Sequence, residues 1–325
     1  MDRTDGDCFT LRVTPGEGAL AAAFAALPET GPARVLLAPG VYREKAVLAR
    51  PDTTLEGSGA ADTRLVWSDG AKTILPDGMK RGTFRTATLM IDAPRVTLRG
   101  LTVENDAGPR ETAGQAIALY VDGDFFRCED CVLLSHQDTL FTAPLPPREV
   151  EPNGFIGPKQ FAPRTPQRHL YRRCRIEGDV DFIFGGAAAW FEDCDIVAAD
   201  GRADRSSPCL SFATAASTPE GQRFGYVFSH CRFRVAGSEG AYYFGRPWRE
   251  YARTVLLRCE LDGRFHPAGW QDWDKPAFHT LGLYAEYGCT GPGAVGERAP
   301  FVRRLSDEEA AAYTLDALWA SLPSA

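Results

Sequence analysis

A short phrase built around cysteine recurs through the middle and C-terminal parts of the chain. An apolar residue or a further cysteine stands three positions before each central cysteine, and an aliphatic or aromatic residue stands two positions after it. The triplets are Cys128, Cys131 and Leu133; Tyr171, Cys174 and Ile176; Phe191, Cys194 and Ile196; Phe228, Cys231 and Phe233; and Leu256, Cys259 and Leu261. Apolar positions that alternate with charged or variable ones have the period of a β-strand. A strand that recurs between glycine-rich turns, without a helical pattern between, predicts a solenoid of stacked β-coils. Chance recurrence of small cysteines in another all-β protein is the alternative.

The rest of the sequence has the same character. Short strand-like runs separated by glycine, proline or asparagine occur at 35–44, 53–59, 88–105 and 116–121. Residues 17–27 are expected to form a helix that caps the first coil. Residues 306–322, with Ser306 as the N-cap, are expected to form a helix that packs at the C-terminal end. We therefore expect one all-β solenoid domain over residues 1–325, with short terminal helices.

Charge and cysteine content restrict the function and the compartment. The net charge of −7 and the pI near 5.4 argue against general binding to nucleic acids or anionic membranes. No apolar run approaches the roughly 20 residues of a membrane span. The first residues lack the basic start and apolar stretch of a signal peptide, so a cytoplasmic protein with nine reduced cysteines is expected. Cys174 and Cys194, one coil apart, are near enough to consider a disulfide, but we expect free thiols that fill the core.

An aspartate interrupts the apolar run 180–184, and the coil register pairs it with a second aspartate. Asp181 lies seven residues after Cys174, and Asp138 lies seven residues after Cys131. Equivalent positions of successive coils stack about 4.8 Å apart, so the two carboxylates should be neighbours on one face. For each aspartate taken alone, an ordinary turn or bulge residue is the alternative.

Two glutamines are expected beside this pair. Gln137 directly precedes Asp138, and Gln115 precedes Gln137 by 22 residues, which is close to one coil. Two adjacent carboxylates cannot both ionise cheaply, so the pKa of one should rise and the other should need a cation. Such a pair with amide donors beside it is a candidate acid and nucleophile.

Motifs of other chemistries find little support. The sequence contains no GxSxG, HExxH or Walker motif, and Cys128 and Cys131 form its only CxxC pair. The five histidines are irregularly spaced and are expected to be packing or surface residues rather than ligands. We expect neither a metal nor a cofactor.

Seven longer segments carry a more specific signal. They are "GVYREK" (40–45), "GQAIALYV" (114–121), "HQDTLF" (136–141), "GDVDFIFG" (178–185), "FGRPW" (244–248), "AGWQDW" (268–273) and "YAEYGCTGPGA" (284–294). In this order they resemble the pectin methylesterases of carbohydrate esterase family 8, and the resemblance runs from about residue 10 to beyond residue 300.

The resemblance implies a right-handed parallel β-helix and an aspartyl esterase that removes methyl groups from galacturonate carboxylates. It implies that Asp181 is the nucleophile and that Asp138 is the general acid and then the base. Gln115 and Gln137 would stabilise the oxyanion, and Arg246 would pair with Asp181. The residues implied to bind substrate are Trp248, Phe141, Trp270 and Phe182.

Some positions are expected to be structural or depart from the family pattern. Tyr42 and Glu44 of the first segment are expected to be a buried hydroxyl and carboxylate that stabilise early coils. Phe141 stands where tyrosine is common, and Cys289 where asparagine is usual in the closing segment. His136 stands in place of the more usual glycine–aromatic pair. None of these departures touches the reacting atoms, but they affect fine substrate specificity.

Three classes of function follow from these expectations. The first is an esterase acting on methyl-esterified galacturonan, pectin or its oligomers, and working as a monomer; a thioesterase is a variant of it. The second is a pectate-lyase-like enzyme on a similar β-helix, which would need acidic calcium sites and an arginine or lysine that is free to act as base. The third is a galacturonan-binding module without catalysis.

A proline-rich segment interrupts the coil spacing. Asp138 and Asp181 are 43 residues apart, whereas Cys174 and Cys194 are 20 apart, so about 23 residues should leave the solenoid. The segment 143–168 has seven prolines and little strand pattern, which predicts a semi-rigid loop beside the catalytic cleft. We expect the loop to wall one end of the groove, with three cations facing substrate carboxylates: Arg148, Lys159 and Arg164. A decorative surface insertion is the alternative.

Overall fold

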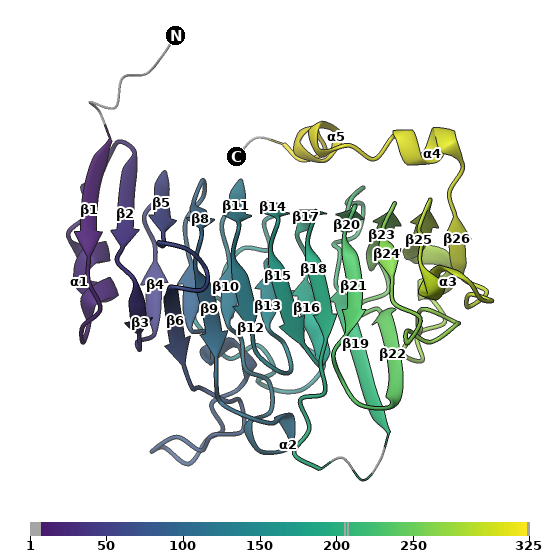
Figure 1. The fold of residues 1–325 in the computed structure, drawn as a ribbon, viewed down its shortest axis with the longest axis horizontal. Coiled ribbons are helices and arrows are strands. Elements are labelled where there is room, and N and C mark those ends of the chain that lie inside the picture. Colours follow the sequence, from purple (N-terminus) through teal and green to yellow (C-terminus); the bar gives the residue numbers. More distant parts are fainter. Residues whose placement is uncertain (1–7, 205, 207, 324–325) are drawn as a thin grey trace.

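The strands of the protein lie in three long parallel sheets that wind around a common core (Figure 1). The coordinates are a computed structural model that describes residues 8–204, 206 and 208–323. In the central coils the chain enters the three sheets in turn, which are called sheets A, B and C below. The predicted all-β, right-handed parallel β-helix is confirmed.

The sheets differ in length. Sheet A has 11 strands: β1 (Phe9–Val13), β2 (Ala33–Leu37), β5 (Thr53–Glu56), β8 (Thr97–Arg99), β11 (Phe126–Glu129), β14 (Arg168–Arg172), β17 (Ala188–Glu192), β20 (Tyr226–Ser229), β23 (Arg253–Leu257), β25 (Leu283–Tyr287) and β26 (Val302–Arg304). Sheet B has eight: β3 (Gly40–Tyr42), β6 (Thr63–Trp67), β9 (Thr102–Asn105), β12 (Val132–Leu134), β15 (Arg175–Gly178), β18 (Asp195–Ala198), β21 (Arg232–Val235) and β24 (Glu260–Leu261). Sheet C has seven: β4 (Ala46–Leu48), β7 (Leu89–Ile91), β10 (Leu119–Val121), β13 (Leu140–Thr142), β16 (Val180–Gly185), β19 (Cys209–Ala216) and β22 (Gly240–Gly245).

The cysteine repeat marks the corner between sheets A and B. The residue before each of the five aligned cysteines has a left-handed backbone, with φ between 51° and 55°: Asp130, Arg173, Asp193, His230 and Arg258. Residues other than glycine rarely adopt this conformation, although aspartate tolerates it better than most. The corner turns the chain, and the small cysteine that follows is buried inside the coil. The cysteine repeat in the sequence therefore arises from the corner between sheets A and B, which has the same backbone geometry in each of these coils.

The position three residues before each cysteine forms a stack in the core. The rings of Tyr171 and Phe191 lie 4.7 Å apart and 9° from parallel, and those of Phe191 and Phe228 lie 4.4 Å apart and 12° from parallel. Parallel in-register strands put equivalent side chains directly above one another, which brings the aromatic faces into contact. The alignment read from the sequence is confirmed here.

The cysteines themselves are unpaired. All nine are free, and seven of them are buried. The Cys174 sulfur lies 3.8 Å from that of Cys128, while the Cys174 amide donates to the Cys194 sulfur at 3.4 Å. The thiols thus pack as small apolar groups against backbone polar atoms.

The described helices are short, and they lie at the two ends of the chain and in loops. They are α1 (Ala19–Ala25), α2 (Arg110–Ala113), α3 (Phe278–Leu281), α4 (Asp307–Ala311) and α5 (Leu315–Ala320), with single 3₁₀ turns at Thr83–Arg85 and Pro292–Ala294. None of the helices in these described ranges is long and apolar enough to cross a membrane. The expected first helix is confirmed in α1, which places Leu20 and Ala23 in the core.

The C-terminal helix was predicted incorrectly in two respects. Ser306 caps α4 through a capping box with Glu309, as expected, but Thr314 then caps a second helix, α5. The segment also turns back over sheet A instead of covering the C-terminal end (Figure 1). There Leu318 packs in a cluster on the outer face of sheet A, and Trp319 stacks on Phe125 at 5.3 Å.

Tyr42 and Glu44 occupy the structural positions expected of them. The Tyr42 hydroxyl is buried and donates to the Val13 carbonyl at 2.8 Å, and the Glu44 carboxylate accepts the Leu20 amide at the start of α1. Both side chains join the first coils to the helix that covers them.

The predicted departure from the solenoid is also confirmed. Leu140 of β13 lies opposite Ile183 of β16, which are 43 residues apart in sequence. Residues 143–167, between β13 and β14, form neither helix nor strand. Asp138 and Asp181 therefore lie in adjacent coils, as the cysteine alignment requires.

Candidate active site

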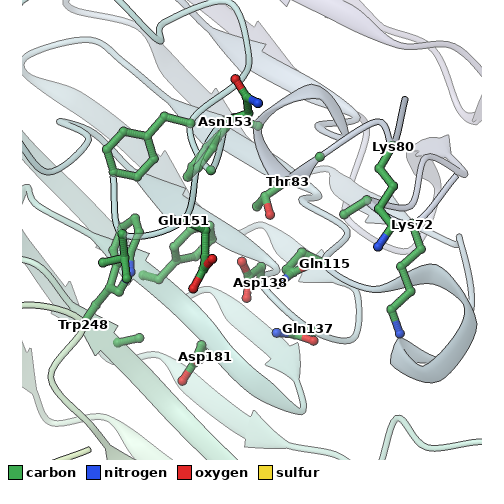
Figure 2. Close-up of a pocket in the computed structure, with 18 of the residues that line it drawn as sticks. Lys72, Lys80, Thr83, Gln115, Gln137, Asp138, Glu151, Asn153, Asp181 and Trp248 are labelled. Carbon is green, nitrogen blue, oxygen red and sulfur yellow. The ribbon is translucent and has the colours of Figure 1, made fainter. Parts of the chain in front are cut away.

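A cavity of about 640 Å³ opens over sheet C (Figure 2). Its walls include all five residues expected to take part in catalysis and one of those expected to bind substrate: Gln115, Gln137, Asp138, Asp181, Arg246 and Trp248. Residues separated by more than one hundred positions in sequence thus meet at one surface of the solenoid.

Strands of sheet C bring these side chains together. Gln115 precedes β10, Asp138 precedes β13, Asp181 lies in β16, and Arg246 directly follows β22. Backbone bonds fix the register, because the Asp138 amide donates to the Val180 carbonyl at 3.1 Å and the Arg246 amide to the Thr214 carbonyl at 3.0 Å. The site is therefore built on the rigid ladder of the sheet.

Asp181 lies at an irregularity in β16. The register with β19 shifts between Val180 and Ile183, which is a β-bulge, and Asp181 has a left-handed φ of 51°. A bulge reorients the side chains around it. Here Phe182 and Ile183 both enter the core, while Asp181 lines the cavity. The bulge considered as an alternative from sequence is present, and it is what directs the carboxylate into the cavity.

Arg246 compensates the charge of this aspartate. Its Nε and Nη2 donate to the two carboxylate oxygens of Asp181 at 2.8 and 2.6 Å, in a bidentate pair. The guanidinium itself is held between two rings, 4.0 Å from the centre of Phe212 and 3.6 Å from that of Trp273. Burial raises the pKa of Asp181, and the charge and hydrogen bonds of Arg246 oppose that rise.

Asp138 is buried beside Asp181 without comparable compensation. Only 7% of its surface is exposed, and among residues 8–204, 206 and 208–323 its carboxylate has neither an ion pair nor a hydrogen-bond partner. Burial raises the pKa of Asp138 well above its ordinary value, and the nearby charge of Asp181 raises it further. The two carboxylates therefore differ: the charge of Asp181 is compensated by Arg246, whereas Asp138 favours its protonated form.

A third aspartate behind the site was not singled out from the sequence. Asp179 is fully buried, and its carboxylate lies 3.4 Å from the Arg110 guanidinium. Its charge adds to the rise in the pKa of Asp138. Its place two residues before Asp181 was visible in the sequence, but its contact with Arg110, 69 residues away, was not.

Gln115 and Gln137 lie in the same part of the cavity as Asp138. Figure 2 shows the two amide side chains grouped with the Asp138 carboxylate near the centre of the view. The Ala116 amide donates to the Gln137 carbonyl at 3.0 Å, which places the two glutamines in neighbouring coils as expected. Neutral amide donors at this position can stabilise negative charge that develops next to the two carboxylates.

Comparison with known proteins identifies the family of this chain. The sequence profile of the pectinesterase family matches residues 17–145 and 164–320. The chain belongs to the pectinesterase family. It is 33% identical over 286 residues to pectinesterase QRT1 of Arabidopsis thaliana, covering 85% of this chain and 66% of that protein. The chain thus spans just under two-thirds of the length of this curated relative.

Solved structures of pectin methylesterases have the same fold as this pectinesterase-family chain. The carrot enzyme is 27% identical, with a TM-score of 0.74 over 94% of this chain and 91% of that one. A pectin methylesterase in complex with a hexasaccharide is 25% identical, with a TM-score of 0.77 over 96% of this chain and 97% of that one.

Three aromatic residues predicted to bind substrate do not line the cavity. Phe141 is buried in an aromatic cluster, with its ring 5.0 Å from that of Phe84, and Phe182 is buried in the solenoid core. Trp270 is also buried, stacks on Tyr284 at 4.2 Å and donates its indole N–H to Glu286. The prediction fails because the sequence does not show which side of the sheet or loop an aromatic residue faces.

Other aromatic residues supply the apolar surface of the cavity. Phe84, Phe155, Phe184 and Trp273 line it together with Trp248. Phe184 could have been found from sequence, since it lies in the same short run as Asp181. Phe84 and Phe155 lie in loops without a motif, so the sequence gives no signal for them.

The loop cations do not face the cavity as expected. Lys159 forms ion pairs with Asp92 and with Asp122, the latter at 3.8 Å. Arg164 donates to backbone carbonyls within the same loop, and Arg148 does not line the cavity. The cations lining the cavity, within the described part of the chain, are Lys72, Lys80, Arg246 and Arg249. No cluster of three or more potential metal ligands is found among the described residues.

Proposed function

We propose that this chain hydrolyses the methyl esters of galacturonate units in pectin or its oligomers and releases methanol. The observation that carries the proposal is the unequal pair of carboxylates: Asp181 held by Arg246, and Asp138 buried with a raised pKa. Family membership and the hexasaccharide bound to a structural relative support the substrate class.

In the first step Asp181 attacks the carbonyl carbon of the ester. A bond forms from the Asp181 carboxylate oxygen to that carbon, and the bond from the carbon to the methoxy oxygen breaks. The proton of Asp138 passes to the departing methoxy group and gives methanol. Gln115 and Gln137 donate to the oxyanion of the tetrahedral intermediate.

In the second step water regenerates the enzyme. Asp138, now ionised, accepts a proton from water, and the resulting hydroxide attacks the acyl carbon. Asp181 leaves as a carboxylate, its bidentate contact with Arg246 stabilising the negative charge that returns to it. Asp138 has then recovered its proton, and the product is a free galacturonate.

The same contact argues against the lyase alternative. A lyase would need an arginine or lysine free to remove a proton, but the Arg246 guanidinium is committed to Asp181 and enclosed by two rings. The pair of carboxylates with different pKa values also argues against a purely binding function. A single charged carboxylate would serve binding equally well. A thioester substrate would use the same groups and is a variant of this proposal.

We also propose that the protein acts as a monomer and does not bind nucleic acids or anionic membranes. A single chain should suffice for activity, because every group assigned a role lines one cavity within one chain. Nucleic acids and anionic membranes should not be partners, because the net charge is −7. The cytoplasmic location expected from the sequence remains a prediction.

A methanol-release assay on methyl-esterified galacturonate oligomers, with calcium chelated, tests the proposal. Asp181→Asn should lower the rate by at least about 10⁴-fold, the scale of losing a catalytic nucleophile. Asp193→Asn is a matched control, because Asp193 is exposed at a left-handed corner that asparagine also tolerates. Substantial methanol release by Asp181→Asn would show that the assigned nucleophile is wrong.

A further inference from the structure

The cavity contains a segment that the family profile does not match. The profile matches up to residue 145 and resumes at residue 164, so residues 146–163, called the insertion below, lie outside the matched ranges. Six consecutive residues of this insertion, 150–155, line the cavity that contains Asp138 and Asp181. Long loops without secondary structure are commonly functional when they are ordered.

Contacts within the loop and with an earlier coil fix the insertion in place. The Glu149 carboxylate accepts the amides of Asn153 and Phe155 at 3.2 and 3.3 Å. The Arg164 guanidinium donates to four carbonyls, those of residues 146, 159, 160 and 162, and Lys159 pairs with Asp92 of an earlier coil. The insertion is therefore an ordered wall of the cavity, held by Glu149 within it, by Arg164 directly after it and by the ion pair from Lys159 to an earlier coil.

The insertion also contacts residues 82–84, which line another part of the cavity. Phe155 is buried, and its ring packs 5.8 Å from Phe84 and 6.2 Å from Trp248. A Cβ atom at Gly82 would lie 2.9 Å from Ile156, so the two loops are in direct contact there. The cavity volume of about 640 Å³ lies within the range of about 300–1,000 Å³ that is usual for small-ligand sites. A few sugar units fit such a site better than an unbroken polymer does.

The tip of the insertion places a negative charge in the cavity. Glu151 lines it, and Figure 2 shows its carboxylate pointing inward on the Trp248 side, with Lys72 and Lys80 on the other side of the two aspartates. A de-esterified galacturonate carries a carboxylate, whereas an esterified one is neutral. Glu151 would repel the first and tolerate the second, because like charges repel; since Glu151 is exposed, solvent limits this repulsion to that of a surface charge pair.

We propose that insertion 146–163 makes this enzyme selective for short, highly esterified galacturonate oligomers, with Glu151 discriminating against de-esterified units near the reacting ester. This inference rests on the proposed function. It extends that function by assigning a substrate class to a segment that the family profile leaves out.

The first test shortens the tip of the wall. Replacing residues 150–154 by Gly-Gly removes five of the six lining residues but keeps Phe155, Lys159 and Arg164, which anchor the loop. The kcat/KM for methanol release is then measured on esterified trigalacturonate and on highly esterified pectin. The ratio of polymer to oligomer should rise severalfold. An unchanged ratio in a variant with the melting temperature of the wild type would refute the proposal that the insertion selects for short oligomers.

The second test removes one charge without changing shape. With Glu151→Gln, unesterified trigalacturonate should inhibit more strongly, its inhibition constant falling by about two- to fivefold, the range of one charge interaction near a surface. The effect should shrink at high salt. Glu149→Gln is the control, because it removes the same charge from the same loop but its side chain faces the loop's own amides. Equal effects of the two variants, or none from Glu151→Gln, would reject the role of Glu151.

The wild-type enzyme separates this inference from the proposed function. No methanol release by the wild type on any esterified galacturonate would refute the proposed function itself. Methanol release with no change of selectivity in either variant would refute only the role assigned to the insertion.

Discussion

Replacing Arg246 by methionine tests the electrostatics of the site most directly. Methionine keeps apolar bulk between Phe212 and Trp273 but removes the charge that compensates Asp181. The Arg246 and Asp181 side chains are only 16% and 9% exposed, so solvent screens the pair weakly. Two unit charges about 4 Å apart attract by ~4 kcal/mol at an effective dielectric constant of ~20. Removing one partner of a buried pair costs about 3–5 kcal/mol, which agrees with this magnitude.

The cost should depend on pH in a defined direction. Without Arg246 nothing comparable opposes the effect of burial, so the pKa of Asp181 rises further. A carboxyl whose pKa is higher in the folded than in the unfolded protein makes the folded state bind more protons, so stability falls as pH rises between the two values. Arg246→Met should therefore differ little from the wild type below about pH 4, where the unfolded-state carboxyl is protonated, and lose stability above it.

Activity and melting temperature measured against pH give the assay. The acidic limb of methanol release should move to higher pH in Arg246→Met, because the nucleophile ionises later. Arg249→Met is the matched control: Arg249 lines the same cavity, but its guanidinium donates to the carbonyls of Trp248 and Arg148. An acidic limb that stays in place in Arg246→Met, or that moves equally in both variants, would refute the assignment of Arg246 to Asp181.

Three further predictions concern the stability of the protein and the state of its thiols. Asp138→Asn should abolish methanol release yet raise the free energy of unfolding at neutral pH, by ~1.4 kcal/mol for each unit by which burial raises the pKa of Asp138, and this gain should vanish in acid. Gly185→Ala should destabilise by at least about 2 kcal/mol in urea unfolding, because its φ is +125° and a Cβ would lie 2.0 Å from the Thr142 carbonyl oxygen. Gly16→Ala, where a Cβ would meet nothing within 4 Å, is its control. Thiol counting on denatured protein purified without air should find nine, and seven or fewer would contradict the reduced state.

The periodic part of the structure could be predicted from the sequence because one corner repeats. Each of the five cysteines follows a left-handed residue and precedes a strand of sheet B, so a single alignment gives the register of five coils. That register alone places Asp138 and Asp181 in adjacent coils, 43 residues apart. The proline-rich segment between them then had to leave the solenoid, because it lacks a strand pattern.

The positions that were missed depend on partners remote in sequence. Lys159 was expected to meet substrate, but it is used by Asp92 and Asp122, which belong to earlier coils. The sequence predicted that residues 306–322 are helical and pack against the solenoid, but it did not show that they pack on sheet A. The start of α5 did have a sequence signal, since threonine is a favoured N-cap residue and the Thr314 side chain accepts the Ala317 amide.

The position of Asp181 within an apolar strand follows from three separate features. A bulge lets Phe182 and Ile183 both enter the core and leaves the aspartate on the cavity side. Its left-handed backbone would cost a larger or branched residue more, since aspartate is among the few side chains that tolerate this conformation. Arg246, two coils further along sheet C, compensates the charge. Glutamate at position 181 would keep the charge but lose the fit to the backbone and to the two guanidinium nitrogens. The residue type is therefore fixed by the fold as much as by the chemistry.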